Sequence, residues 1–228
     1  FKHMSEMLYP HRNAFTSPQL SELLRDNDHF IIVDTRSAAA FTEGFIPGSL
    51  FIGFEGRFIE WAVNLLPAGK QIVLITPAGK EEACAEMLTD AGFTNVAGYL
   101  QGGFEAWKDS GGAVDMIIDV DAGEMAMDIP FDENLIVVDV RRPVEYAEGH
   151  VKDALNIPLI DMKDPGNIAH LNERDNLYLH CAAGYRSVIA ASLLKMQGYN
   201  NLRNVTGGWE SIKHTKGITI VKEPAALN

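Results

Sequence analysis

The sequence is poor in cysteine, poor in positive charge and free of long apolar runs. Two cysteines among 228 residues argue against a disulfide-stapled secreted scaffold and leave the thiols free for chemistry. With 19 Lys and Arg against 31 Asp and Glu, the formal net charge is −12, which disfavours nucleic acid and membranes as partners. No segment approaches the roughly 20 apolar residues that span a bilayer. We therefore expect a globular, cytoplasmic protein.

A long internal repeat organises the chain. The stretch "FIIVDTRSAAAFTEGFIPGSLFI" (30–52) aligns with "LIVVDVRRPVEYAEGHVKDALNI" (135–157) at a constant offset of 105 residues, which pairs Asp34 with Asp139. The same offset places "LQGGFEAWK" (100–108) over "VTGGWESIK". Similarity of this length predicts two homologous domains. The expected segments are an N-terminal extension (1–12), a first domain (13–110) and a second domain (111–228).

Each half alternates short apolar, β-branched runs with helical stretches. The expected strands include 30–33, 71–75, 135–138 and 176–179, and the expected helices include 80–91 and 187–197. This alternation predicts an α/β protein of two domains, each a parallel β-sheet flanked by helices on both faces. Ligands of such sheets bind at the carboxyl ends of the strands. Cys181 directly follows one of the strands, so it stands where a site is expected.

The segment "HCAAGYRS" (180–187) carries the candidate chemistry. Loop amides and the start of the next helix bring positive potential and free N–H donors to one point. This environment favours the thiolate form of Cys181, which makes it the candidate nucleophile. Ala182, Ala183 and Gly184 leave the backbone open to an anion, and Gly184 can adopt a positive φ to close the loop.

The second part of the loop adds polar side chains. Arg186 supplies a cation whose fork geometry suits an oxyanion. Ser187 can cap the helix or donate a hydrogen bond, and Tyr185 is expected to line the same pocket. Residues 182–187 together therefore form a candidate anion-binding cradle around the thiol.

Other polar residues have simpler interpretations. A free cysteine is usually a buried structural thiol, and Cys84, inside the helical stretch "EEACAEML", fits that role. His180 alternates with Cys181 along the strand, so we expect it to point away from the pocket. The seven histidines show no metal-ligand spacing and there is no nucleotide-binding loop. We predict no metal and no cofactor.

These motifs resemble the rhodanese superfamily. The resemblance rests on "CAAGYRS" after an apolar strand, "VVDVR" upstream, "EYAEGHVKDALNIP" between them and "GGW" downstream. It covers nearly the whole chain as two tandem domains and is more specific in the second. It implies a thiosulfate sulfurtransferase-like enzyme, in which Cys181 takes a sulfane sulfur from a small sulfur-containing anion and passes it to a thiol or cyanide.

The resemblance also implies roles for residues outside the loop. Asp139 and Arg141 would brace the fold around the loop, and Trp209 would pack beside it. The order of the domains resembles the C-terminal part of bacterial fusions in which a metallo-β-lactamase-like domain precedes tandem rhodanese domains. We therefore expect such a domain, fused or separate, as a partner in persulfide oxidation.

Three other functions stay open. Protein phosphatases of the same superfamily also use a thiolate, but by resemblance their loops have five residues between Cys and Arg, whereas four separate Cys181 from Arg186. The shorter loop favours sulfur over phosphorus. Arsenate reduction, by resemblance to related single-domain proteins, is a second possibility. The third possibility is a persulfide carrier or interaction module of a larger protein, without turnover of its own.

The first domain lacks the residues that this chemistry needs. At the offset of 105 residues, Thr76 stands in place of Cys181, and Glu81 and Glu82 stand in place of the arginine and serine. Two carboxylates would repel an anion. We predict that the first domain is catalytically inactive and has a structural role.

Overall fold

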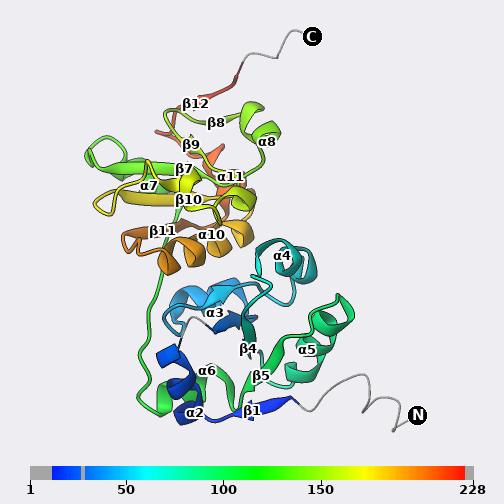
Figure 1. Ribbon diagram of the computed structural model, residues 1–228. Coiled ribbons are helices and arrows are strands. Elements are labelled where there is room, and N and C mark those ends of the chain that lie inside the picture. Colours follow the sequence, from blue (N-terminus) through cyan, green and yellow to red (C-terminus); the bar gives the residue numbers. More distant parts are fainter. Residues whose placement is uncertain (1–11, 27–28, 224–228) are drawn as a thin grey trace. The chain divides into compact units, whose positions relative to one another are not determined.

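The computed structural model describes residues 12–26 and 29–223, and the chain divides into two compact units between Met116 and Ile117 (Figure 1). The expected N-terminal extension lies outside the described residues except for Arg12. Within the described part, no helix has the length and apolar character needed to cross a bilayer.

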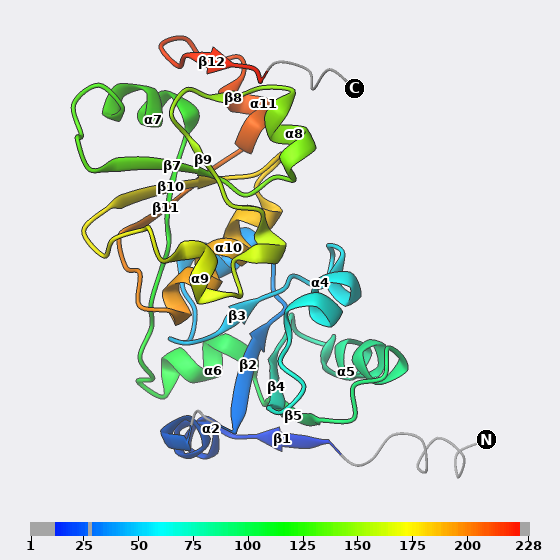
Figure 2. The ribbon, with the colours of Figure 1, turned by 45° about the horizontal axis from the view of Figure 1, so that its top comes forward.

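The first unit is a five-stranded sheet with the order β1-β5-β4-β2-β3, in which all paired strands are parallel. Its strands are β1 (Asn13–Phe15), β2 (Phe30–Asp34), β3 (Leu50–Phe51), β4 (Gln71–Ile75) and β5 (Val96–Leu100). Its helices are α2 (Ser17–Leu23), the 3₁₀ turn η1 (Leu24–Asp26), α3 (Ala38–Glu43), α4 (Phe58–Leu65), α5 (Glu81–Asp90) and α6 (Gly103–Asp109). Figure 2 shows α4 and α5 on one face of this sheet and α2 and α6 on the other.

The second unit repeats this plan with the order β6-β11-β10-β7-β9, again parallel throughout. Its strands are β6 (Ile118–Val120), β7 (Leu135–Asp139), β8 (His150–Val151), β9 (Leu155–Asn156), β10 (Asn176–His180), β11 (Leu202–Val205) and β12 (Ile220–Val221). Its helices are α7 (Ala122–Asp128), α8 (Pro143–Ala147), the 3₁₀ turn η2 (Leu159–Asp161), α9 (Pro165–Ile168), α10 (Tyr185–Met196) and α11 (Gly208–Ile212). A small antiparallel pair, β12 with β8, lies beside the main sheet.

The apolar side chains of the second sheet are buried on both faces, as a covered parallel sheet requires. Tyr178 of β10 belongs to a cluster with Met125 of α7 and Ile212 of α11. Its neighbours Leu177 and Leu179 point to the opposite face because side chains alternate along a strand, and both are fully buried. Figure 2 shows α9 and α10 on that second face.

The predicted fold class is confirmed: both units are parallel sheets flanked by helices. The predicted start of one helix is wrong. We expected it at Ser187, but α10 begins at Tyr185, directly after Gly184. Gly184 has φ 107°, and this left-handed conformation lets the chain enter the helix two residues earlier than the apolar pattern indicates. Ser187 is therefore inside the first turn and is not the cap.

Candidate active site

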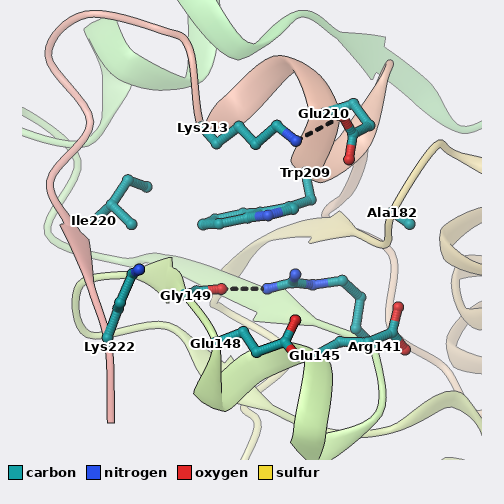
Figure 3. Close-up of a pocket in the computed structure, with 10 residues that line it drawn as sticks. All are labelled: Arg141, Glu145, Glu148, Gly149, Ala182, Trp209, Glu210, Lys213, Ile220 and Lys222. Atoms are coloured by element: carbon teal, nitrogen blue, oxygen red, sulfur yellow. Dashed lines mark hydrogen bonds and ion pairs between the residues drawn. The ribbon is translucent and has the colours of Figure 1, made fainter. Parts of the chain in front are cut away.

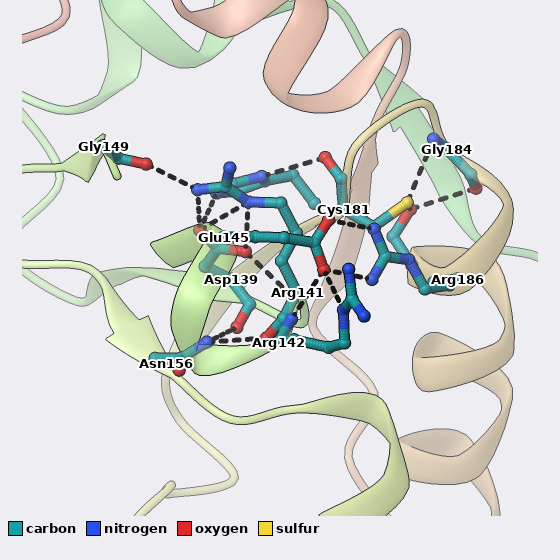
Figure 4. Close-up of polar contacts among 11 residues, drawn as sticks. Asp139, Arg141, Arg142, Glu145, Gly149, Asn156, Cys181, Gly184 and Arg186 are labelled. Atoms are coloured by element: carbon teal, nitrogen blue, oxygen red, sulfur yellow. Dashed lines mark hydrogen bonds and ion pairs between the residues drawn. The ribbon is translucent and has the colours of Figure 1, made fainter. Parts of the chain in front are cut away.

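Cys181 lies at the carboxyl end of β10, in the turn that leads into α10. Because residues alternate along the strand, His180 turns toward α11, where its ring centre lies 6.3 Å from that of Trp209. Cys181 turns to the opposite side. The positive φ of Gly184 folds the loop back, and the Gly184 N–H donates to Cys181 Sγ at 3.1 Å (Figure 4).

The start of α11 holds this loop through its backbone. The Trp209 N–H donates to the Cys181 carbonyl at 2.7 Å, and the Glu210 N–H donates to the Ala182 carbonyl at 3.2 Å. Gly208 comes so close that a Cβ atom built on it would lie 2.5 Å from the Cys181 carbonyl oxygen. The glycine before Trp209 is therefore a packing requirement of the loop.

The thiol is buried beside a chain of hydrogen bonds. Cys181 is 2% exposed, and Ser187 Oγ lies 3.7 Å from its Sγ. The Ser187 hydroxyl has nearer acceptors in Asn204 Oδ1, at 2.7 Å, and the Gly184 carbonyl, at 3.0 Å. The Asn204 amide donates to Asp119 at 2.7 Å, which fixes Oδ1 toward Ser187. The sulfur thus has one close donor, the Gly184 N–H, which favours sulfur in its anionic form. The single Ser187 proton is directed to its nearer acceptors.

The predicted anion-binding arginine is already paired. The Arg186 guanidinium donates to both oxygens of Glu145, each at 2.8 Å, and neither side chain is more than about a quarter exposed. Arg142 contacts the same carboxylate from the solvent side at 3.1 Å. The Arg186 hydrogen bonds, more than any other contact, lower the pKa of Glu145 from 4.5 to about 2. Glu145 raises the pKa of Arg186 in return, so this pair is ionised at any physiological pH.

The remaining loop residues surround the thiol from outside. Ala183 is exposed at the tip of the loop, whereas Ala182 is half-buried. Tyr185 is also half-buried, and burial raises the pKa of its phenol to about 12. The tyrosine therefore stays neutral and offers the site no charge.

Asp139 and Arg141 form a buried brace below the loop. Arg141 donates to both carboxylate oxygens of Asp139 and to the Gly149 carbonyl at 2.7 Å (Figure 4). Its guanidinium lies 4.3 Å from the Trp209 ring centre. The Arg141 guanidinium, whose charge is balanced by Asp139, thus positions the Trp209 ring.

The first domain contains the same brace. Arg36 donates to both oxygens of Asp34 and to the Gly44 carbonyl at 2.7 Å, and its guanidinium lies 4.1 Å from the Phe104 ring centre. A feature that both domains share, although only one has the cysteine, serves the common fold. This argument supports the bracing role and separates Asp139 and Arg141 from the chemistry.

His180 is fully buried between the brace and the loop. Its Nδ1 lies 3.3 Å from the Cys181 carbonyl and its Nε2 lies 3.6 Å from Asp139 Oδ2. Desolvation lowers its pKa despite the nearby carboxylate, so the imidazole is neutral. Its side chain lies on the face opposite to the thiol, and its contacts are structural.

Sequence reasoning missed three polar residues of this site: Glu145, Asn204 and Asp119. Each contacts the loop directly or through one neighbour. A comparison of the two halves contains the signal, since these positions carry a carboxylate or an amide only in the half that has the cysteine. At the offset of 105 residues their counterparts are Ala40, Tyr99 and Ala14.

The equivalent loop of the first domain is filled by its own side chain. The Gly79 N–H, which corresponds to the Gly184 N–H, lies 3.2 Å from Glu81 Oε1 and donates to it. Glu82 pairs with Arg12 at 2.9 Å, and Thr76 is buried in place of the thiol. Inactivity of this domain stays a prediction, and these contacts give it a physical reason. Cys84 is fully buried in α5, and burial raises the pKa of its thiol.

Across residues 12–26 and 29–223, no group of three or more His, Cys, Asp or Glu side chains is arranged to hold a metal ion. The polar groups of the loop are N–H and O–H donors and one guanidinium, and this set suits an anion. The arrangement can hold a sulfur-centred nucleophile, stabilise it when charged, and shield it from solvent.

Comparison with known proteins agrees with this architecture. A "Sulfurtransferase" of Allochromatium vinosum is 29% identical over 93 residues, which are 41% of this chain and 85% of the relative. A "Thiosulfate sulfurtransferase" of Pseudomonas aeruginosa is 27% identical over 235 aligned positions, covering 78% of this chain and 86% of the relative. A Bacillus subtilis protein, YrkF, whose name describes a sulfur carrier, is 39% identical over 77 residues, but the match spans 40% of its length and 34% of this chain.

Among solved structures, the crystal structure of the thiosulfate sulfurtransferase from Pseudomonas aeruginosa covers 92% of this chain and 43% of its own, with 17% identity and a TM-score of 0.42. The family model described as "Rhodanese-like domain" matches residues 16–110 and again residues 124–215. The chain therefore belongs to the rhodanese family, as a tandem of two rhodanese-like domains.

Proposed function

We propose that the second domain is a sulfurtransferase that carries a sulfane sulfur as a persulfide on Cys181. The observation that supports this most directly is the surroundings of the sulfur, which accepts a hydrogen bond from the Gly184 N–H in a water-poor loop and has the Ser187 Oγ 3.7 Å away. An anionic outer sulfur would remain within reach of the same donor. Four residues separate Cys181 from Arg186, one fewer than in the phosphatase loops that this segment resembles, and the shorter loop favours sulfur over phosphorus.

The reaction has two balanced steps. In the first, the Cys181 thiolate attacks the sulfane sulfur of a donor such as thiosulfate. A bond forms between the two sulfurs, the sulfur–sulfur bond of the donor breaks, and sulfite leaves with the electron pair. In the second, a thiolate or cyanide attacks the outer sulfur of the persulfide, and Cys181 leaves as the thiolate. The enzyme returns to its starting state, and no outside oxidant or reductant is needed.

Intact-protein mass spectrometry tests this proposal. After incubation with thiosulfate, the wild-type chain should gain the mass of one sulfur atom, and cyanide should remove it as thiocyanate. The Cys181→Ser variant should gain nothing, whereas Cys84→Ser, which changes the buried thiol of the other domain, should load like the wild type. A wild-type chain that gains no sulfur from any sulfane donor refutes the proposal.

A persulfide carrier is the second candidate, because the thiol is 2% exposed and a bulky acceptor cannot reach it without movement of the loop. A carrier would load sulfur in the same experiment but would release it to cyanide and small thiols slowly. Rapid discharge by small acceptors would exclude this candidate.

A metallo-β-lactamase-like partner domain that consumes or supplies the persulfide remains part of the proposal.

A further inference from the structure

A chain of three polar side chains leads from the sulfur of Cys181 to the edge of the second sheet. Ser187 Oγ lies 3.7 Å from Cys181 Sγ and donates to Asn204 Oδ1 at 2.7 Å. The Asn204 amide donates to Asp119 Oδ1 at 2.7 Å, and the two residues are direct neighbours across the strand pair β11 and β6. Ser187 and Asn204 are buried, whereas Asp119 is exposed. The chain therefore connects the thiol to a carboxylate that solvent can reach.

The carboxylate fixes the direction of these hydrogen bonds. An ionised carboxylate can only accept, so Asn204 must turn its NH₂ group toward Asp119 and its oxygen toward Ser187. The single proton of the Ser187 hydroxyl then has Asn204 Oδ1 and, at 3.0 Å, the Gly184 carbonyl as acceptors. Both acceptors are nearer than the sulfur. A lone pair of the Ser187 oxygen therefore faces Cys181, and the thiol S–H can donate to it.

The first domain keeps the backbone of this arrangement but not its side chains. At the offset of 105 residues, Glu82, Tyr99 and Ala14 stand in place of the serine, the asparagine and the aspartate. Ala14 and Tyr99 are again direct neighbours across a parallel strand pair. The shared fold therefore does not need these three polar groups, and they occur only together with the cysteine.

We propose that Asp119 is a positioning residue, which holds Ser187 as an acceptor toward Cys181 and so makes the domain retain a bound sulfur. Without a proton from Ser187, the Cys181 thiolate has one hydrogen bond fewer, so it is a stronger nucleophile and a poorer leaving group. The inner sulfur of the persulfide is uncharged and does not need that bond. The retention of sulfur rests on the proposed sulfurtransferase function, whereas the direction of the chain does not.

Discharge is the step that this arrangement slows. An attacking thiolate or cyanide forms a bond to the outer sulfur, the sulfur–sulfur bond breaks, and its electron pair moves to Cys181, which becomes a thiolate. In an Asp119→Ala variant, the Asn204 amide loses its charged acceptor and can turn, so the Ser187 proton can be donated to the new charge. With a Brønsted coefficient of about 0.5, a change of one pH unit in the ionisation of the leaving thiol makes discharge roughly threefold faster.

The direction of the chain is tested on the full 228-residue protein without a sulfur donor. The infrared S–H stretching band of Cys181 is recorded in Cys84→Ser, at a pH where the thiol is protonated. It should lie at lower wavenumber than the band of a thiol in hydrocarbon solvent and should rise in the double variant with Ser187→Ala. A band of Cys181 at the position of an unbonded thiol would overturn the proposal, and this measurement needs no change in Asp119.

A double-mutant cycle separates the chain from the bare charge of Asp119. In Asp119→Ala the midpoint of the pH profile for alkylation of Cys181 by iodoacetamide should fall by about one unit. In the Ser187→Ala background the same substitution should shift the midpoint no more than Glu173→Ala does, which removes a carboxylate from an exposed position. Equal shifts in both backgrounds would mean that Asp119 acts through its charge alone and would overturn the proposal.

The other charged and titratable groups around the loop are the same in all of these variants: Arg186, Glu145, His180, Asp139, Arg141 and Tyr185. The pocket of about 510 Å³ beside the Trp209 indole (Figure 3) is also the same, because Ser187, Asn204 and Asp119 do not line it. A change in the rate of discharge therefore reports on the chain of hydrogen bonds.

Discharge of the loaded persulfide by cyanide tests the retention of sulfur. Asp119→Ala should discharge about threefold faster than the wild type, and Ser187→Ala, which has no hydroxyl to donate, should not. An unchanged rate in Asp119→Ala together with a shifted alkylation profile would overturn the retention. A wild-type protein that takes up no sulfur would refute the sulfurtransferase, while the infrared and alkylation results would still decide the role of Asp119.

Discussion

Replacing Glu145 by glutamine tests whether the donor anion must compete with a carboxylate for Arg186. In the structure each terminal nitrogen of the Arg186 guanidinium donates one N–H to Glu145 at 2.8 Å. A carboxyl whose pKa falls from 4.5 to about 2 is stabilised as the anion by roughly 3 kcal/mol, a value that includes the weaker contact with Arg142. An incoming dianion such as thiosulfate meets an arginine whose charge is already balanced.

The glutamine side chain keeps one oxygen as an acceptor, so Arg186 should stay in place while its charge becomes available. Part of the roughly 3 kcal/mol is screened by solvent, because Glu145 is 22% exposed. We expect about 1.4 kcal/mol to favour the donor, which corresponds to a roughly tenfold lower KM for thiosulfate. Rates of thiocyanate formation, measured against thiosulfate concentration at low and at physiological salt, give this value. Salt should reduce the gain.

Glu173→Gln removes the same charge from an exposed position and controls for a change in the overall field. An unchanged or raised KM in a folded Glu145→Gln variant would refute the reasoning. It would mean that Glu145 is needed to position Arg186 and does not compete with the donor.

Three further predictions concern Glu145, the loop of the first domain and Gly208. Because the pKa of Glu145 is depressed in the fold, its ionised form contributes stability, roughly 1.5 kcal/mol after solvent screening, that is present above about pH 4.5 and is lost as the pH falls toward 2. Urea unfolding between pH 7 and 3 should show Glu145→Gln approaching the wild type in stability, and parallel curves would contradict this. Thr76→Cys in a Cys181→Ser background should gain no sulfur from thiosulfate by mass spectrometry, because the Glu81 carboxylate occupies the loop. Loading at wild-type rates would show that the missing thiol is the only reason for the inactivity of the first domain. Gly208→Ala should lower the free energy of unfolding by about 2 kcal/mol, since φ is +53° and the new Cβ would press on the Cys181 carbonyl. The rate of persulfide formation should fall as well. An unfolding midpoint equal to that of the wild type would disprove this clash.

Much of this architecture is visible in the sequence because the duplication shows it twice. Apolar runs such as 71–75 and 176–179 match strands β4 and β10 closely, since a strand covered on both faces must be apolar throughout. The position of Cys181 after β10 follows from that pattern. The start of α10 does not, because it depends on the backbone conformation of Gly184.

The pairing of Arg186 shows a second limit of sequence reasoning. The loop sequence places a cation near the thiol, but the partner of that cation comes from α8, 41 residues away. Such long-range pairs depend on how β7 and β10 are placed side by side. The hydrogen-bond chain through Asn204 has the same origin, since β11 follows the loop in sequence but carries Asn204 back beside it.

The carboxylate of Glu81, on the Gly79 N–H of the first domain, acts as a tethered ligand. A group attached to the chain two residues from its binding site has an effective concentration of at least the millimolar range. A free anion of equal intrinsic affinity would have to exceed that concentration to displace it. The occupancy of this loop should therefore be independent of the supply of sulfur anions around the protein, so that only the second domain can respond when that supply changes.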